Sequence, residues 1–203
     1  MIAIVDYGLG NISAFANIFN RANTPFQLAR TADDLSQASK IILPGVGSFD
    51  YAMQLLEASG MESELHRKVR DQKTPVLGVC VGMQMMARVS EEGTRPGLGW
   101  IDGEVKKFAE SPDRSVRIPH MGWNNASPTR VHPLVDGLDD ESRFYFLHSY
   151  YFSCDRPEDV VATTEYDGRF ACAVAHENVL GVQFHPEKSH RWGHRLLENF
   201  NRL

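Results

Sequence analysis

The stretch Pro-Val-Leu-Gly-Val-Cys-Val-Gly, residues 75–82, decides the fold because it passes from the pattern of a strand to that of a turn. Its apolar run predicts a buried strand over 75–79, and helical spacing predicts a helix over 81–89. Between the two, Cys80 stands in the form Gly-x-nucleophile-x-Gly, which is typical of a nucleophile elbow. Flanking glycines permit a sharp turn, and a helix start favours a thiolate. We interpret Cys80 as a candidate nucleophile; a buried structural cysteine is the alternative.

The residues before this stretch alternate between the patterns of strands and helices. We expect strands at 2–6, 25–29 and 40–43, and helices at 12–21, 32–38, 49–57 and 61–70. Such alternation implies parallel strands joined by right-handed crossovers.

The residues after 99 have a different pattern, in which short apolar runs follow one another across turns. We expect strands at 100–108, 116–119, 143–146, 160–165, 170–176 and 179–184, and a closing helix at 194–200. No linker, repeat or low-complexity segment divides the chain. The sequence therefore predicts one α/β domain over 1–203 with a central, mostly parallel mixed sheet, helices on both faces and an antiparallel extension.

Composition limits the classes of function that the chain can have. Its 203 residues are 42% hydrophobic and 23% charged, which is typical of a globular protein long enough to bury its own core. The formal net charge is −5, and Lys and Arg are scattered along the chain. A nucleic-acid groove is not indicated, so we expect no nucleic-acid partner.

The three cysteines, Cys80, Cys154 and Cys172, are an odd number without a CxxC pair. This pattern favours neither a disulfide framework nor a zinc site, and it suits a reducing compartment. The first residues lack the basic leader and long apolar run of a signal peptide. No run of 18 apolar residues predicts a membrane span. We expect a cytoplasmic protein that has no membrane partner and binds no metal.

A thiol nucleophile needs a base, and the base needs an orienting group. Gln-Phe-His-Pro-Glu at 183–187 supplies both, because residues two apart in an extended chain point to the same side. Glu187 can then hold one ring nitrogen of His185 while the other faces the thiol. A strand-end histidine beside a solvated glutamate is the structural alternative. The pair indicates a catalytic role only in combination with Cys80.

A second glycine-rich turn, Pro-Gly-Val-Gly at 44–47, follows the strand expected at 40–43. Glycines in such a turn let backbone N–H groups point at a ligand, as an oxyanion hole requires. An ordinary turn between strand and helix is the alternative. Beside a nucleophile at the end of another parallel strand, the turn becomes a candidate site wall.

The two signatures Gly-Val-Cys-Val-Gly-Met-Gln at 78–84 and Gln-Phe-His-Pro-Glu at 183–187 resemble those of class I glutamine amidotransferases, in the same order. Five further segments resemble the glutaminase subunits of imidazole glycerol phosphate synthases within that family. They are Asp-Tyr-Gly-Leu-Gly-Asn at 6–11, Leu-Pro-Gly-Val-Gly at 43–47, Ser-Glu-Glu-Gly at 90–93, Pro-His-Met-Gly-Trp-Asn at 119–124 and Tyr-Phe-Leu-His-Ser-Tyr-Tyr at 145–151. The resemblance runs from the first residue to the final helix, and it implies that the α/β fold is flavodoxin-like.

This resemblance implies a role for each matching residue. Cys80 would be the nucleophile, His185 the general base and acid, and Glu187 the group that orients it. The backbone N–H groups of Val81 and Val46 would form the oxyanion hole, although the subfamily usually has Leu at position 81. The pocket for the substrate, L-glutamine, would be lined by Gly47, Gln84, Glu92, Ser149 and Tyr150.

The resemblance also implies a partner and no cofactor. Ammonia released from glutamine would pass to a cyclase subunit with a (β/α)₈ barrel fold, in a heterodimer that makes imidazole glycerol phosphate and aminoimidazole carboxamide ribotide in histidine biosynthesis. The interface would include Asn11, Trp123, Tyr145 and Lys188. The segment at 190–194 is bulkier than the resemblance implies and leaves the identity of the partner open.

Four other functions stay open at this point. The same glutaminase chemistry could feed a cyclase-like partner in another amidination pathway, for example on a surface sugar. A subunit of anthranilate synthase fits less well at 120–124. A thiol-type α/β-hydrolase acting on esters or lactones usually has its acid before the histidine, whereas Glu187 follows His185. The last alternative is a scaffold without enzymatic activity.

Overall fold

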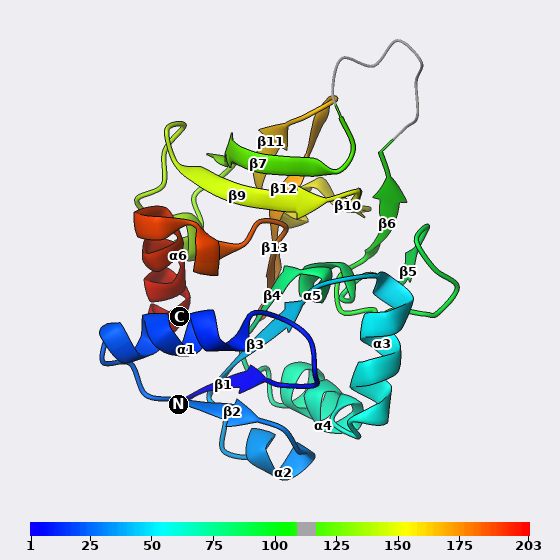
Figure 1. Ribbon diagram of the computed structural model, residues 1–203, viewed down its shortest axis with the longest axis vertical. Helices are drawn as coiled ribbons and strands as arrows, with labels where there is room; N and C mark the ends of the chain where they lie inside the picture. Colours follow the sequence, from blue (N-terminus) through cyan, green and yellow to red (C-terminus); the bar gives the residue numbers. More distant parts are fainter. Residues whose placement is uncertain (109–116) are drawn as a thin grey trace.

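A central sheet runs through the computed structural model, which describes residues 1–108 and 117–203 (Figure 1). Within these residues the sheet has 11 strands, with the main order β2-β1-β3-β4-β13-β12-β10-β6-β5; β11 pairs with β12 and β8 with β11. Its strands are β1 (Ile2–Val5), β2 (Phe26–Ala29), β3 (Lys40–Gly45), β4 (Val76–Cys80), β5 (Val89–Ser90), β6 (Gly103–Lys107), β8 (Ser127–Pro128), β10 (Tyr150–Cys154), β11 (Val160–Glu165), β12 (Arg169–His176) and β13 (Val179–Val182). The fold class expected from the sequence is confirmed.

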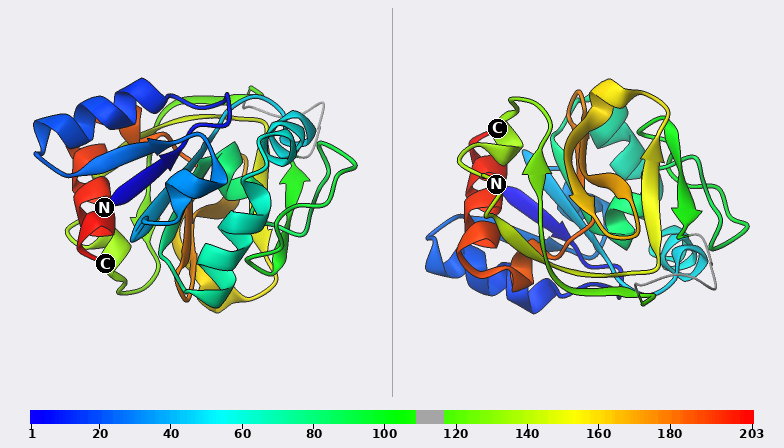
Figure 2. Two further views of the ribbon diagram at one scale, coloured as in Figure 1. Left: turned by 90° about the horizontal axis from the view of Figure 1, so that it is seen from below. Right: turned by 90° about the horizontal axis from the view of Figure 1, so that it is seen from above.

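Helices cover both faces of the parallel half of the sheet. α1 and α6 lie on one side and α3 and α4 on the other (Figure 2). The helices are α1 (Ile12–Arg21), α2 (Ala32–Leu35), α3 (Phe49–Ala58), α4 (Glu62–His66), α5 (Val81–Gln84) and α6 (His190–Arg202), with a π-helical turn η1 (Arg67–Asp71) and 3₁₀ turns η2 (Pro133–Val135), η3 (Pro157–Asp159) and η4 (Pro186–Lys188). In the described part of the chain, no helix has both the length and the apolar character needed to cross a membrane.

The parallel strands are held by burial on both faces. Every residue of β1, β4 and β13 is buried, as expected for apolar runs that helices cover from both sides. Phe15 and Phe19 of α1 are buried against this sheet, and full burial of such a side chain contributes about 1.5–3 kcal/mol. Because β3, β4 and β13 pair in parallel, their carboxyl ends meet at one edge of the sheet.

A separate antiparallel ribbon crosses above this edge (Figure 1). It consists of β7 (His120–Asn125) and β9 (Arg143–His148). Side chains alternate along each strand, so His120 and His148 are buried whereas Met121, Trp123 and Leu147 are exposed. The backbone of Tyr145 also bridges to His185, which ties the ribbon to the carboxyl end of β13.

The prediction of a helix over 81–89 is wrong beyond residue 84. The amide of Leu98 donates to the carbonyl oxygen of Met85 at 2.7 Å, and the amide of Trp100 donates to that of Met86 at 2.9 Å. A second segment of chain therefore takes the acceptors that a longer helix would use. The chain then extends into β5.

Several other boundaries differ from expectation. The strand expected to stop at Pro44 continues to Gly45, because parallel pairing with β4 places Gly45 opposite Cys80. The closing helix begins earlier, at His190. Two strands are shorter than expected: the one expected at 100–108 begins at Gly103, and the one expected at 179–184 ends at Val182. The helix expected over 32–38 ends at Leu35. The last turn of the helix expected over 61–70 is π-helical.

Two strands of the second half, β8 and β10, were not predicted, and the prediction nearest to β7 is misplaced. Residue 116 of the strand expected at 116–119 lies outside the described residues; 117–119 are not in a strand, and β7 starts at His120. The alternation in β7 is weakened by Gly122 and by polar residues. β10 was missed because its aromatic run follows directly on β9 across Ser149.

Candidate functional site

A pocket of about 350 Å³ opens where the carboxyl ends of β3, β4 and β13 meet the ribbon β7–β9. Its lining residues are Val46, Gly47, Cys80, Val81, Gln84, Glu92, Pro119, Leu147, His148, Ser149, Tyr150, His185 and Lys188. Strands distant in the sequence therefore bring Cys80 and His185 into one cavity. Crevices at the carboxyl ends of parallel strands are the usual ligand sites of open α/β sheets.

Cys80 occupies the turn between β4 and α5, in the strand–turn–helix order expected of a nucleophile elbow. Its backbone has φ of 56° and ψ of −114°, a strained conformation for a residue with a side chain. Close packing enforces the turn: a Cβ added at Gly82 would lie 1.9 Å from the carbonyl oxygen of Leu43. Glycine at this position lets the end of β3 pass directly beside the elbow.

Replacing Gly82 by alanine should lower the free energy of unfolding by about 3 kcal/mol or more, because the added Cβ clashes with the backbone of β3 and not with the end of a flexible side chain. Gly60→Ala is a matched control. Gly60 has a positive φ of 70°, which Gly82 does not, but nothing lies within 4 Å of a Cβ added at Gly60, so only backbone strain of about 1–2 kcal/mol is expected there. Urea unfolding of both variants measures the difference; equal losses would show that the elbow is not tightly packed.

His185 and Glu187 form a buried pair next to Cys80. Nδ1 of His185 lies 2.9 Å from Oε1 of Glu187, and the two side chains are 4% and 1% exposed. The two side chains meet as expected. The expected cause, that residues two apart in an extended strand point to the same side, is wrong. β13 ends at Val182, and the carboxylate turns back to the ring through the 3₁₀ turn η4, which Pro186 starts.

The electrostatics of His185 depend on both neighbours. Burial lowers the pKa of the imidazole, but hydrogen bonds to Cys80 and Glu187 and the charges of these groups outweigh it and raise the pKa to about 10. The ring is therefore protonated at neutral pH in the resting site. A protonated ring between a carboxylate and a sulfur stabilises negative charge on the sulfur.

The other two cysteines have a different environment. Burial, followed by the charges of Asp159 and Asp155, raises the pKa of Cys154 to about 12. Burial also raises the pKa of Cys172, which is completely buried, well above its usual range. Both thiols stay protonated at neutral pH, so neither is suited to attack a substrate.

All seven residues expected to form the oxyanion hole or the substrate pocket lie on the wall of this cavity: Val46, Val81, Gly47, Gln84, Glu92, Ser149 and Tyr150. Oε2 of Glu92 accepts the amide N–H of Phe49 at 2.9 Å, while burial raises the pKa of this carboxyl. Sequence reasoning missed the pocket role of Pro119, Leu147 and His148. For Leu147 and His148, the only signal in the sequence was that they directly precede Ser149 and Tyr150.

The residues expected at a partner interface lie outside or at the rim of the pocket. Asn11 is exposed immediately before α1, and Trp123 is 41% exposed on β7. Lys188 lies over the ring of Tyr145, 5.6 Å from its centroid, and also lines the pocket. Met121 and Leu147 are also exposed and lie opposite each other on β7 and β9. Together with Trp123 they give the ribbon an exposed apolar surface.

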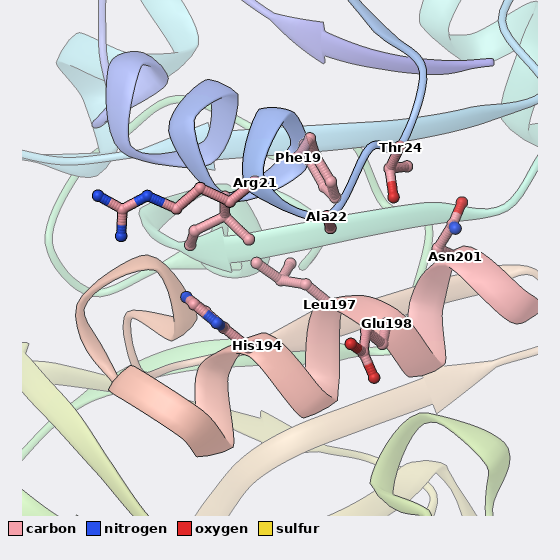
Figure 3. Close-up of a pocket in the computed structure, with 9 residues that line it drawn as sticks. Phe19, Arg21, Ala22, Thr24, His194, Leu197, Glu198 and Asn201 are labelled. Carbon is pink, nitrogen blue, oxygen red and sulfur yellow. The ribbon is translucent and has the colours of Figure 1, made fainter.

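A second groove, of about 190 Å³, lies between α1 and α6 (Figure 3). Arg21 and Phe19 line it from α1, and His194, Leu197 and Glu198 from α6. It contains none of the residues expected to be catalytic. Among residues 1–108 and 117–203, no group of three or more His, Cys, Asp or Glu side chains could hold a metal ion.

A thiol on a strained turn, an imidazole beside it and a carboxylate behind the imidazole are typical of hydrolases that use a cysteine nucleophile. The model of the glutamine amidotransferase class-I family matches residues 3–202. The chain belongs to this family, as its two signatures indicated.

Its relatives point to one group within the family. The chain is 54% identical to the imidazole glycerol phosphate synthase subunit HisH of Bdellovibrio bacteriovorus and 50% identical to that of Leptospira interrogans, with 100% of both chains covered in each case. It is 46% identical to the protein named imidazole glycerol phosphate synthase subunit HisH 2 of Pseudomonas aeruginosa, again over 100% of both chains.

Solved structures share the fold at low identity. A crystal structure of a glutamine amidotransferase matches with a TM-score of 0.78 at 20% identity, over 99% of this chain and 97% of the other. A chain in the structure of PurLQS from Thermotoga maritima matches with a TM-score of 0.74 at 16% identity, over 99% and 97%.

Proposed function

We propose that this chain is a glutaminase that hydrolyses L-glutamine to glutamate and ammonia, as the glutaminase subunit of an imidazole glycerol phosphate synthase in histidine biosynthesis. The observation that carries the proposal is that Cys80 and His185 meet at one pocket, with Glu187 paired to His185. Full-length similarity to subunits of that name supports the pathway. No metal or cofactor is needed for the chemistry, and the place of action is the cytoplasm.

The reaction splits one difficult step into two. The sulfur of Cys80 attacks the side-chain amide carbon of glutamine, so that a sulfur–carbon bond forms and the carbonyl π electrons move to oxygen. As the tetrahedral intermediate collapses, the carbon–nitrogen bond breaks and protonated His185 gives its proton to the departing ammonia. The neutral ring then takes a proton from water as the water oxygen attacks the thioester carbon. The carbon–sulfur bond breaks, glutamate leaves after losing a proton to solvent, and the thiolate beside protonated His185 is restored.

Backbone N–H groups of Val46 and Val81 are the proposed donors to the oxyanion. Both residues line the pocket with Cys80: Val46 directly follows β3, and Val81 directly follows Cys80, the last residue of β4. Removing one such donor typically lowers kcat by about 10²–10³-fold. The turn at 44–47 contains Gly47 with φ of 85°, so it can reorient its peptides when a partner docks.

The remaining pocket residues recognise the α-carbon end of glutamine. Both N–H groups of Gln84 donate within the protein, to the carbonyl oxygen of Tyr150 and to Oε1 of Gln183, each at 3.0 Å. Only the side-chain oxygen of Gln84 is left to serve a ligand, and an acceptor suits the α-ammonium group. Glu92 adds a carboxylate for the same charge, and Gly47, Ser149 and Tyr150 complete the wall.

Ammonia protonates in water at neutral pH and then is no longer a nucleophile. A synthase therefore gains from releasing ammonia directly into a second subunit. We propose that a cyclase subunit with a (β/α)₈ barrel docks on the exposed side of β7–β9, near Asn11, Trp123, Tyr145 and Lys188. The isolated chain should hydrolyse glutamine slowly and accelerate strongly when the partner holds its acceptor ligand. Equal rates with and without the partner would contradict this coupling.

A second candidate function uses the same glutaminase chemistry with a cyclase-like partner of another amidination pathway. One observation favours keeping it: the bulky segment at 190–194 borders the proposed interface. In that segment, His190 stacks on Trp123 at 5.2 Å between ring centroids. Co-purification with each partner, followed by glutamine-dependent assay of each product, distinguishes the two pathways.

Replacing Trp123 by alanine should weaken partner binding about 30-fold, because a large exposed aromatic at the centre of an interface typically contributes about 2 kcal/mol. The measurement is the partner concentration that half-activates glutamine hydrolysis. Val131→Ala is the matched control: Val131 is an apolar side chain that is 100% exposed and lies outside β7 and β9. If both variants bind the partner as the parent protein does, the proposed interface is wrong.

A further inference from the structure

A buried row of polar side chains connects the ribbon β7–β9 with Cys80; His148 and Gln84 of this row line the pocket, and His120 and Gln183 lie behind them. Nδ1 of His148 lies 2.8 Å from the carbonyl oxygen of Tyr150, and its Nε2 lies 2.9 Å from Nδ1 of His120. On the other side of the same carbonyl, Gln84 reaches Gln183, whose Nε2 lies 3.8 Å from the sulfur of Cys80. The row thus has Tyr150 at its centre and the sulfur at one end.

The carbonyl oxygen of Tyr150 fixes the direction of every bond on the histidine side, because it can only accept. Nδ1 of His148 must therefore carry the proton, which leaves Nε2 of the neutral ring as an acceptor. His120 must then donate from Nδ1 and accept at Nε2. Asn124 meets that requirement: its amide nitrogen lies 3.3 Å from Nε2 of His120 and also donates to the carbonyl oxygen of Glu165 at 2.9 Å.

The glutamine side has an equally determined direction. Gln84 faces the Tyr150 carbonyl with its amide nitrogen, and the second N–H of that nitrogen donates to Oε1 of Gln183. The amide nitrogen of Gln183 is consequently the atom that faces the sulfur. Gln84 and His148 therefore both donate to the carbonyl oxygen of Tyr150. From Gln84 the hydrogen bonds continue through Gln183 to the sulfur of Cys80.

The surroundings keep both histidines neutral and in place. His120 is buried between Phe146 and Tyr166, with ring centroids 4.6 Å and 3.9 Å away. Burial lowers the pKa of His120 to about 4. Burial also lowers the pKa of His148 to about 3, and the neighbouring rings of His120 and His185 further disfavour a positive charge there, although the bond to Tyr150 opposes the shift. Neither ring can then reverse its bonds by taking up a second proton near neutral pH.

We propose that His120 and His148 are positioning residues that hold the Ser149–Tyr150 wall of the glutamine pocket, through a hydrogen-bond chain with one permitted direction from Asn124 to the Tyr150 carbonyl. The proposal rests on the function proposed above, in which this pocket binds glutamine for attack by Cys80. Since β7 presents Met121 and Trp123 outward and His120 inward, the chain starts on the strand proposed to receive the partner.

The protonation pattern tests the chain without an activity assay. Long-range ¹H–¹⁵N spectra of the ring nitrogens of the full chain at pH 7 should show two buried neutral histidines with the proton on Nδ1, assigned by their loss in His120→Phe and His148→Phe. A proton on Nε2 alone, or on both nitrogens, of either ring would overturn the proposal. Whether Cys80 is the nucleophile is tested separately, because loss of the sulfur leaves these tautomers in place.

Kinetics of variants, assayed in the complex with the partner, tests the positioning role. His120→Phe keeps the ring stack but leaves Nε2 of His148 without a donor, so KM for glutamine should rise about tenfold, with a smaller change in kcat. His120→Asn restores an N–H near the position of Nδ1 and should recover most of that loss. Tyr166→Phe is the control, since it keeps the stack and removes only the bond from its hydroxyl to the carbonyl oxygen of Arg117.

An unchanged KM in His120→Phe, with the variant folded, would overturn the positioning role. The same holds if Tyr166→Phe raises KM as much as His120→Phe does. A loss confined to kcat would also contradict it, because the wall acts on the bound substrate and not on the sulfur.

Discussion

Replacing Cys80 by alanine is expected to lower glutamine hydrolysis by about 10⁵-fold or more, to the level of background. In the proposed mechanism the sulfur is the only protein atom that forms a covalent bond to the substrate. The measurement is glutamate release by the complex with its partner, at saturating glutamine. Ammonia supplied from solution should still be used by the partner, because only the source of ammonia is lost.

Cys154→Ala is the matched control for this substitution. It removes a thiol that burial keeps protonated and that lies outside the pocket, on β10. It should leave the rate within about twofold of the parent protein, and thermal unfolding should show that both variants fold. Glutamine turnover by folded Cys80→Ala would remove the nucleophile assignment, and with it the proposed mechanism.

Glu187→Gln is expected to lower kcat by about 10³-fold or more while the protein stays folded. The amide oxygen can still accept from Nδ1 of His185, so the geometry is kept, but the negative charge that stabilises the protonated ring is lost. Glutamate release at saturating glutamine measures the effect. Glu177→Gln is the control, since Glu177 is a glutamate exposed to solvent and paired with Lys73.

The pH profile of Glu187→Gln gives a second readout. The carboxylate helps to raise the pKa of His185 to about 10, so the protonated ring persists until the pH rises through that value. Without the charge the pKa of His185 falls, and the alkaline limb of the rate profile should move to lower pH. A limb that stays in place would mean that Glu187 does not act through this histidine.

The architecture of the first half could be predicted because each signal there is local. The helix expected at 12–21 is α1, in which Phe15 and Phe19 are buried at helical spacing, and the glycines around Cys80 indicate the elbow. The end of α5 could not be predicted, because it depends on amides at 98–101 that take the carbonyls of the next turn. Competition between distant segments is not visible in periodicity.

The site could be predicted from its motifs to a similar extent. The pairing of His185 with Glu187 was expected, but the 3₁₀ turn that produces it was not, because Pro186 also suits a strand end. The row through His120 and His148 depends on strand register between β7 and β9, which the sequence does not specify. Both histidines were therefore recognised only as parts of motifs.

The most direct test of the central claim, that Cys80 is the nucleophile of a glutamine pocket, is labelling of the chain by an electrophilic chloromethyl ketone analogue of glutamine, with the site determined by peptide mass spectrometry. We predict a single label on Cys80, loss of activity in proportion to labelling, and protection by glutamine. Inactivation with the label on Cys154 or Cys172, or full activity with Cys80 labelled, would contradict the claim.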